Sequence, residues 1–65
     1  MTEPLRPGDR VLILGSVPER ATVDEVDAWG RPWIITDSER QLRGPKAMRI
    51  GLPRFGVRKI EEDVA

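Results

Sequence analysis

The chain has 65 residues, and its 11 Lys and Arg balance its 11 Asp and Glu, so the formal net charge is zero. Cys, His and Tyr are absent. These counts exclude disulfides and thiolate metal ligands, and they remove the commonest general base and the best nucleophile from any catalytic scheme. The length predicts one small domain, residues 1–65, which buries only about 60% of the surface of its unfolded chain.

The remaining reactive side chains form no catalytic or metal-binding motif. No Ser lies in a Gly-x-Ser-x-Gly elbow, and the glycines do not form a phosphate-binding loop. The acidic residues at positions 24, 25 and 27 lack the spacing and the glycine of an EF-hand loop. We therefore expect a protein that is not an enzyme and has no cofactor and no metal site.

Neither a membrane-spanning segment nor a signal peptide is recognisable. Apolar runs fall well short of the ~20 residues of a membrane helix. The sequence Met-Thr-Glu-Pro at the N-terminus lacks the charged and apolar regions of a signal peptide. The sequence predicts a cytoplasmic protein that does not contact membranes.

The first half of the chain reads as two strands. Residues 9–14 form a short apolar run rich in β-branched side chains, which predicts a strand. In residues 21–28, Val23 and Val26 are three apart, which breaks strict strand alternation and also suits a short helix. We favour a strand with a bulge near residues 24–25, because the bulge places both valines on the buried face.

A hairpin turn is expected at residues 29–32. Gly30 adopts a positive φ without steric cost, and Pro32 has no N–H to donate to a ladder. Residues 33–36 are good strand formers and predict the return strand. Residues 37–45 are polar and end in Gly-Pro, which predicts a loop, with one helical turn as the alternative.

The C-terminal part predicts two further strands. Residues 47–52 alternate, which indicates a half-buried strand with every second side chain from Met48 pointing inward. Residues 53–56 predict a turn or one turn of 3-10 helix, and residues 57–60 predict the last strand. Five short strands at close spacing favour an all-β fold, either a small barrel or a sandwich.

The predicted core combines the inward positions of these strands with the aromatic ring of the 53–56 turn. Its members are Val11, Ile13, Val23, Val26, Ile35, Met48, Ile50, Phe55, Val57 and Ile60. We expect the ordered part to span about residues 7–61, with flexible ends at residues 1–6 and 62–65.

Two segments carry a resemblance to a known family. Residues 7–15, Pro-Gly-Asp-Arg-Val-Leu-Ile-Leu-Gly, are similar to the opening Gly-Asp-x-Val strand of many small bacterial SH3-like and KOW-type domains. Residues 52–60 resemble the SH3 ending, in which a Pro and an aromatic residue lie in a 3-10 turn before the last strand. The resemblance implies a small five-stranded SH3-like barrel with that turn. The chain lacks the tyrosines of the polyproline-binding groove, because it has no Tyr.

Charge is distributed unevenly along the chain. Residues 1–30 have three basic and six acidic residues, whereas residues 31–60 have eight basic and two acidic residues. The segment 40–59 has seven basic residues and no acid: Arg40, Arg43, Lys46, Arg49, Arg54, Arg58 and Lys59. Since Arg and Lys supply most non-specific affinity for phosphates, this segment predicts a face that binds DNA or RNA. The alternative is a solvated face paired with the acidic N-terminal half.

Trp29 and Trp33 lie on either side of the predicted turn. A Trp at a hairpin tip is suited to stack on a base or to anchor a protein partner, and the alternative is that both rings cap the small core. The sequence therefore predicts a nucleic-acid-binding module that uses the basic segment 40–59 and Trp29. The alternative is a protein-interaction module that docks through Trp29 or an exposed edge strand. In either case we expect a monomer or weak homo-oligomer.

Overall fold

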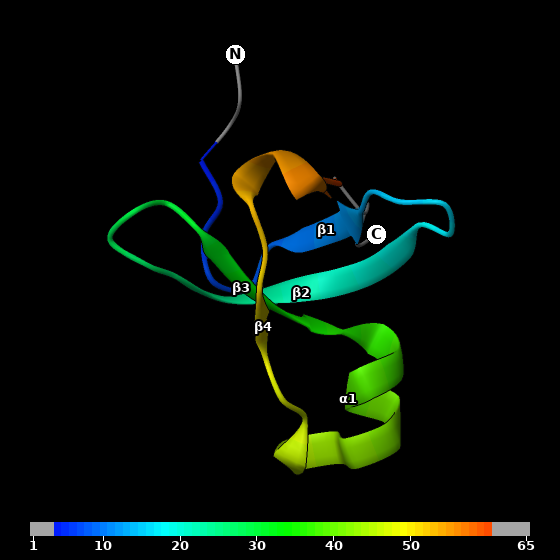
Figure 1. Ribbon diagram of the computed structural model, residues 1–65. Coiled ribbons are helices and arrows are strands. Elements are labelled where there is room, and N and C mark those ends of the chain that lie inside the picture. Colours follow the sequence, from blue (N-terminus) through cyan, green and yellow to red (C-terminus); the bar gives the residue numbers. More distant parts are fainter. Residues whose placement is uncertain (1–3, 61–65) are drawn as a thin grey trace, which may run out of the picture.

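The computed structural model describes residues 4–60 and contains one antiparallel sheet with one short α-helix (Figure 1). The strand order across the sheet is β4-β3-β2-β1-β5. In chain order the elements are β1 (Arg10–Ile13), β2 (Glu19–Val26), β3 (Pro32–Thr36), α1 (Asp37–Arg43), η1 (Gly44–Lys46), β4 (Ile50–Gly51), η2 (Arg54–Gly56) and β5 (Val57–Lys59). The expected mostly-β architecture is confirmed, and so is the 3-10 turn before the last strand.

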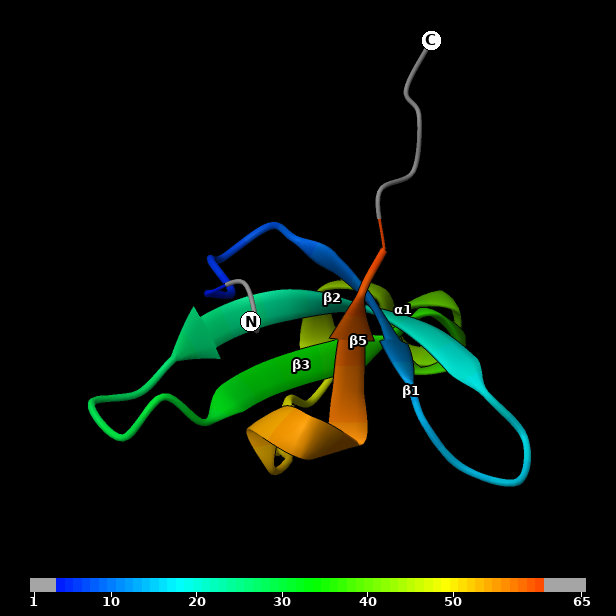
Figure 2. The ribbon, with the colours of Figure 1, turned by 90° about the horizontal axis from the view of Figure 1, so that it is seen from above.

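The sheet is open and strongly twisted. Its two edges are β4 and β5, and within residues 4–60 no ladder joins them. Figure 2 shows β5 running steeply across the direction of β2 and β3, with β1 between them in orientation. A right-handed twist that accumulates from strand to strand produces this change of direction. The strand pairing therefore does not show a closed barrel.

The bulge expected in β2 is present. The register with β3 passes from Val23 opposite Ile34 to Glu25 opposite Trp33, so one residue of β2 has no partner. Val23 is buried and Val26 packs against the core. The extra residue thus keeps both valines on the core face although they are three apart.

The core lies on one face of the sheet and is smaller than predicted. Its buried members are Leu5, Val11, Ala21, Val23, Ile34 and Val57, and Ile13, Val26 and Leu52 pack against them. The prediction is therefore confirmed for Val11, Val23 and Val57. Ile34, which is fully buried, was absent from the predicted set. Ile35 is buried as predicted, but it alternates with Ile34 and so faces the other side of β3.

Three predicted core residues are exposed, so the prediction was wrong for them. The exposed fractions are 69% for Met48, 47% for Ile50 and 85% for Phe55. The strand expected over 47–52 is reduced to the two residues of β4 at the edge of the sheet. Strand alternation shows which residues share a face, but it does not show whether another element covers that face.

The N-terminal segment adds a side chain that the sequence did not predict for the core. Leu5 is buried, although it precedes the expected ordered range of residues 7–61. Hydrogen bonds hold this segment against β2: Gly8 N donates to Val23 O at 2.8 Å, and Val23 N donates to Asp9 O at 2.9 Å. The predictions for residues 1–3 and 61–65 lie outside the described residues.

The loop expected over residues 37–45 was a wrong prediction, because α1 and η1 occupy it. Thr36 caps the helix, since its Oγ1 accepts a hydrogen bond from Glu39 N at 3.1 Å. Gly44 ends the helix with a φ of 56°, which favours glycine. None of the residues of α1 or η1 is buried. The helix therefore projects from the end of β3 as an arm, defined here as residues 37–49, that returns to the sheet at β4 (Figure 1).

We expect Ile34→Ala to lower the free energy of unfolding by about 2–5 kcal/mol, because it leaves a cavity in the core. Since that loss can unfold so small a domain, Ile34→Val provides a milder step of about 0.5–1.5 kcal/mol. Phe55→Ala is the control and should change stability by less than about 0.5 kcal/mol. Urea unfolding followed by circular dichroism measures all three. A larger loss for Phe55→Ala than for Ile34→Val would contradict this assignment of the core.

Candidate functional site

The β2–β3 hairpin loop presents Trp29 to solvent on an ordered backbone. Asp27 organises this loop: its Oδ1 accepts hydrogen bonds from Trp29 N and Arg31 N, both at 2.9 Å. Backbone bonds close the same turn, from Asp27 N to Arg31 O at 3.1 Å and from Gly30 N to Asp27 O at 3.0 Å. Gly30 has the positive φ, 81°, that the sequence predicted. The Trp29 side chain is nonetheless 89% exposed.

The same carboxylate also reaches the start of β3. Asp27 Oδ2 accepts a hydrogen bond from Trp33 Nε1 at 3.2 Å. Desolvation tends to raise the pKa of Asp27, but the hydrogen bonds from Arg31, Trp33 and Trp29 outweigh it and lower this pKa below its usual value. The loop therefore depends on the ionised form of Asp27.

Trp33 is half-buried and joins three segments. Its ring packs so closely on Gly51 of β4 that a Cβ at position 51 would lie 3.1 Å from the ring carbons, so no larger residue fits there without moving the ring. The Arg49 guanidinium lies over the ring, with 5.7 Å between Cζ and the ring centroid. Trp33 thus connects the hairpin loop, the edge strand and the end of the arm.

Polar contacts hold the beginning of the arm to the sheet. Arg10 of β1 forms a two-point ion pair with Asp37, at 2.8 Å from Nη1 to Oδ1 and 2.6 Å from Nη2 to Oδ2. The hydrogen bond from Arg10 is the main cause that lowers the pKa of Asp37. Ser38 donates to the Glu19 carboxylate of β2. The first turn of α1 is therefore fixed by charge rather than by burial.

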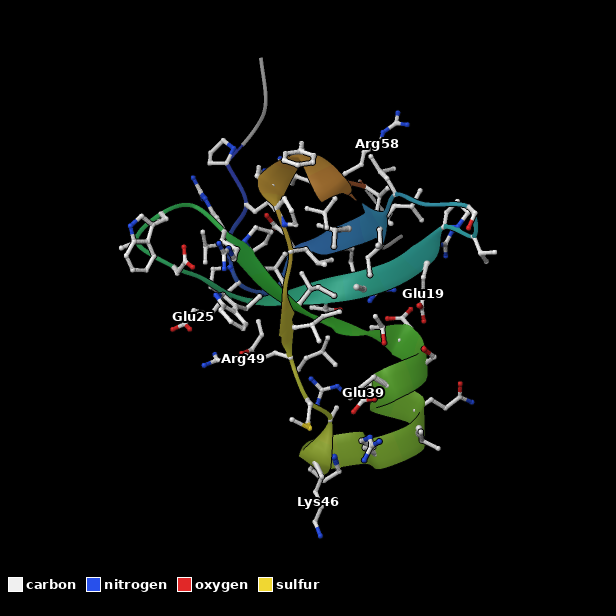
Figure 3. The ribbon with its side chains drawn as sticks, viewed as in Figure 1. Glu19, Glu25, Glu39, Lys46, Arg49 and Arg58 are labelled. Carbon is white, nitrogen blue, oxygen red and sulfur yellow. The ribbon has the colours of Figure 1, made fainter. Side chains whose placement is uncertain are left out.

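The return of the arm is held in the same way. Glu39 Oε2 accepts a hydrogen bond from Met48 N at 3.0 Å and pairs with Arg43 Nε at 2.8 Å. Arg49 Nη1 pairs with Asp24 and Glu25 of β2, at 3.0 Å each. Figure 3 shows Arg49 beside Glu25, and Glu39 between the helix and the returning chain.

The seven basic residues of segment 40–59 do not act as one unpaired group. Arg43, Arg49 and Lys59 form ion pairs with acidic residues, the last with Asp9 at 3.7 Å. Arg54 Nη1 donates to the carbonyl of Val57 at 3.0 Å. Three side chains make no hydrogen bond or ion pair within residues 4–60: Arg40, Lys46 and Arg58.

These three unpaired cations do not form one group. Figure 3 places Lys46 at the tip of the arm and Arg58 at the opposite end of the molecule, near η2. Arg40 lies on α1, and it is exposed like the other two. The unpaired positive charges therefore lie in two places, with Arg40 and Lys46 on the arm and Arg58 on β5.

A hollow of about 570 Å³ lies between the arm and the outer face of β3. Its apolar lining consists of Trp33, Ile35, Pro45, Ala47 and Met48. Its charged lining consists of Arg40, Arg49 and Asp24, of which the last two are paired with each other. The hollow thus combines an apolar floor with one unpaired guanidinium.

Comparison with protein-family models, with curated proteins and with solved structures finds no match. In the part of the chain that the structure describes, His, Cys, Asp and Glu form no group of three that could hold a metal ion. No helix among these residues is long and apolar enough to cross a membrane.

Two functionally placed residues escaped the sequence prediction. The sequence analysis assigned no role to Asp27, although Asp before a Trp-Gly turn has the chemistry to accept backbone N–H groups. Glu39 was placed in a loop, although Thr36 and Glu39 have the three-residue spacing of a capping box, which marks a helix start. The sequence did not predict the hollow, because the hollow forms only where the arm folds back toward β3 in the tertiary structure.

We expect Asp27→Asn to destabilise the protein at neutral pH, because the amide offers one oxygen in place of two acceptors. Since the folded pKa of Asp27 lies below its unfolded value of 3.8, its contribution is present above that pH and disappears as the pH falls through the folded pKa. The difference between wild type and variant should therefore shrink in acid. Urea unfolding of wild type and variant at pH 7 and near pH 2.5 measures it. A difference that stays constant between the two pH values would contradict the assignment.

Proposed function

We propose that this protein is a non-catalytic interaction module that docks a partner protein through Trp29. The observation that carries the proposal is an almost fully exposed Trp on a loop whose backbone is already fixed by Asp27. Trp is among the residues most enriched at interface positions that dominate binding energy. A loop ordered before binding loses less conformational entropy when the complex forms.

We also propose that the fold is related to a small SH3-like barrel, with the arm as an addition and with the edge strands β4 and β5 left unpaired with each other. In support, consecutive strands pair from β1 to β4 and β5 returns to β1, and the turn η2 precedes β5 as the resemblance implies. The arm lies between β3 and β4. On this proposal the arm is an insertion that alters the surface beside β3 without changing the order of the strands.

The other exposed side chains agree with a protein partner better than with a polyanion. Large apolar side chains are exposed at several places besides Trp29: Leu14, Val17, Leu42, Met48, Ile50 and Phe55. Four of the seven basic residues of segment 40–59 have intramolecular partners, namely Arg43, Arg49, Arg54 and Lys59. Interfaces between proteins are enriched in aromatic residues, Met and Arg, whereas nucleic-acid sites are strongly positive overall.

Trp29→Ala tests this proposal. We expect it to weaken partner binding about 30-fold, the effect of losing about 2 kcal/mol at a dominant interface residue. Stability should change by less than about 0.5 kcal/mol, because the side chain is exposed. The measurement is affinity capture from a lysate of the source organism, followed by titration of each captured protein.

Phe55→Ala is the matched control, since Phe55 is an aromatic residue of nearly equal exposure in a different turn. The proposal predicts a partner that is retained by wild type and Phe55→Ala and lost by Trp29→Ala. Equal retention of every captured protein by the two variants would contradict docking through Trp29.

Nucleic-acid binding is the second candidate, favoured by the unpaired side chains of Arg40 and Lys46 on the arm. With about two phosphate contacts, the slope of log affinity against log salt should be about −1.4 on single strands and about −1.8 on duplexes. Arg40→Gln with Lys46→Gln should abolish that slope. Fluorescence titrations with short oligonucleotides at several salt concentrations measure it. Absence of binding at low salt, where screening is weakest, would exclude this candidate.

A further inference from the structure

We propose that the hollow beside the arm binds a peptide segment of the partner in which a carboxylate, from Asp or Glu, lies next to an apolar side chain. This inference rests on the proposed protein-interaction function, and it adds the chemistry of the partner. The hollow holds about 570 Å³ and is lined from three directions, by β3, by α1 with η1, and by the returning chain at residues 47–49. It is therefore large enough for two or three side chains.

The carboxylate is inferred from the charges around the hollow. Arg49 and Asp24 line it, but Arg49 is shared between Asp24 and Glu25 at 3.0 Å each, so its charge is already matched within the protein. Arg40 lines the same hollow and has no partner within residues 4–60. One unpaired guanidinium matches one carboxylate, which it binds through two parallel N–H···O bonds.

The apolar neighbour is inferred from the floor and rim. Met48 is 69% exposed although it lies beside Pro45, Ala47 and the buried Ile35. A Met side chain adapts to irregular apolar partners because it is unbranched and polarizable. An apolar side chain of the peptide would cover Met48 and remove this surface from water.

A peptide carboxylate fits the hollow better than a nucleic-acid backbone does. A run of phosphates needs several unpaired cations along its path, whereas the hollow offers only Arg40 in the part of the chain that the structure describes. The observations therefore favour an acidic–apolar peptide.

Selection of a random peptide library on the immobilised full chain tests the proposal. The expected result is enrichment of peptides with Asp or Glu beside Leu, Ile, Met or Phe. Their affinities are then measured by Trp fluorescence in the Trp29→Phe variant, where Trp33 is the only Trp and lines the hollow. In this background the Trp fluorescence therefore reports on Trp33 alone.

Two substitutions and one control decide the outcome. Arg40→Gln should weaken binding of the selected peptides about tenfold, the effect of losing one hydrogen-bonded charge pair. Gln has a helix propensity close to that of Arg, so α1 is preserved. Met48→Gln should also weaken binding. Arg58→Gln, which removes another exposed and unpaired Arg on β5, should leave the affinity unchanged.

Several results would overturn the inference. These are selection without acidic–apolar enrichment, or equal affinities for Arg40→Gln and Arg58→Gln. Peptides that bind Arg40→Gln normally but are lost by Trp29→Ala would refute the hollow and leave docking through Trp29 intact. Peptides lost by Arg40→Gln but not by Trp29→Ala would support the hollow as a site that binds independently of Trp29. A short oligonucleotide that binds more tightly than the peptides, in a way that depends on Arg40, would also overturn the inference. The ligand of the hollow would then be a nucleic acid.

Discussion

The hydrogen bond from the Trp33 indole to the Asp27 carboxylate is the contact on which the outer face of the sheet depends. Asp27 shapes the hairpin loop, and Trp33 packs on Gly51 of the edge strand and beneath Arg49 at the end of the arm. The hairpin loop is thereby held in fixed relation to the end of the arm and the edge strand that follows it, about 20 residues further along the chain. A two-residue strand such as β4 has few ladder bonds of its own, so its position rests largely on this ring.

The separation of charge along the chain becomes pairing in three dimensions. Acidic residues of the first half meet basic residues of the second half at Arg49 with Asp24 and Glu25, and at Lys59 with Asp9. Each of these bonds links parts of the chain that lie far apart in sequence, and the antiparallel sheet brings them together. Within residues 4–60, these pairs and the hydrogen bond of Arg54 leave Arg40, Lys46 and Arg58 as the unpaired cations of segment 40–59.

Signals from adjacent residues predicted most of the sheet, whereas the remaining features depend on contacts between residues far apart in the sequence. The bulge in β2, the turn at Gly30 and the 3-10 turn before β5 follow from a few adjacent residues, so they were predictable. The core assignment was wrong for Met48, Ile50 and Phe55, which are exposed. The alternation of apolar residues does not show whether another part of the protein covers the face that they share. The spacing of Thr36 and Glu39 is that of a capping box and marks the start of the helix. The sequence nevertheless predicted a loop there, because Gly and Pro are frequent along this chain. The hollow and the paired state of Arg49 require the tertiary structure.

The arm contributes no buried residue from its helices, and this has a consequence for motion. Its order rests on ion pairs and hydrogen bonds at Asp37, Glu39 and Arg49, whereas the core is formed by strands that do not include it. Segments with exposed backbone bonds and little apolar burial open at a lower free energy than the whole domain. We therefore expect residues 37–49 to open at a lower free energy than the strands that form the core. Because salt screens exposed ion pairs, we expect this opening to become easier as the ionic strength rises.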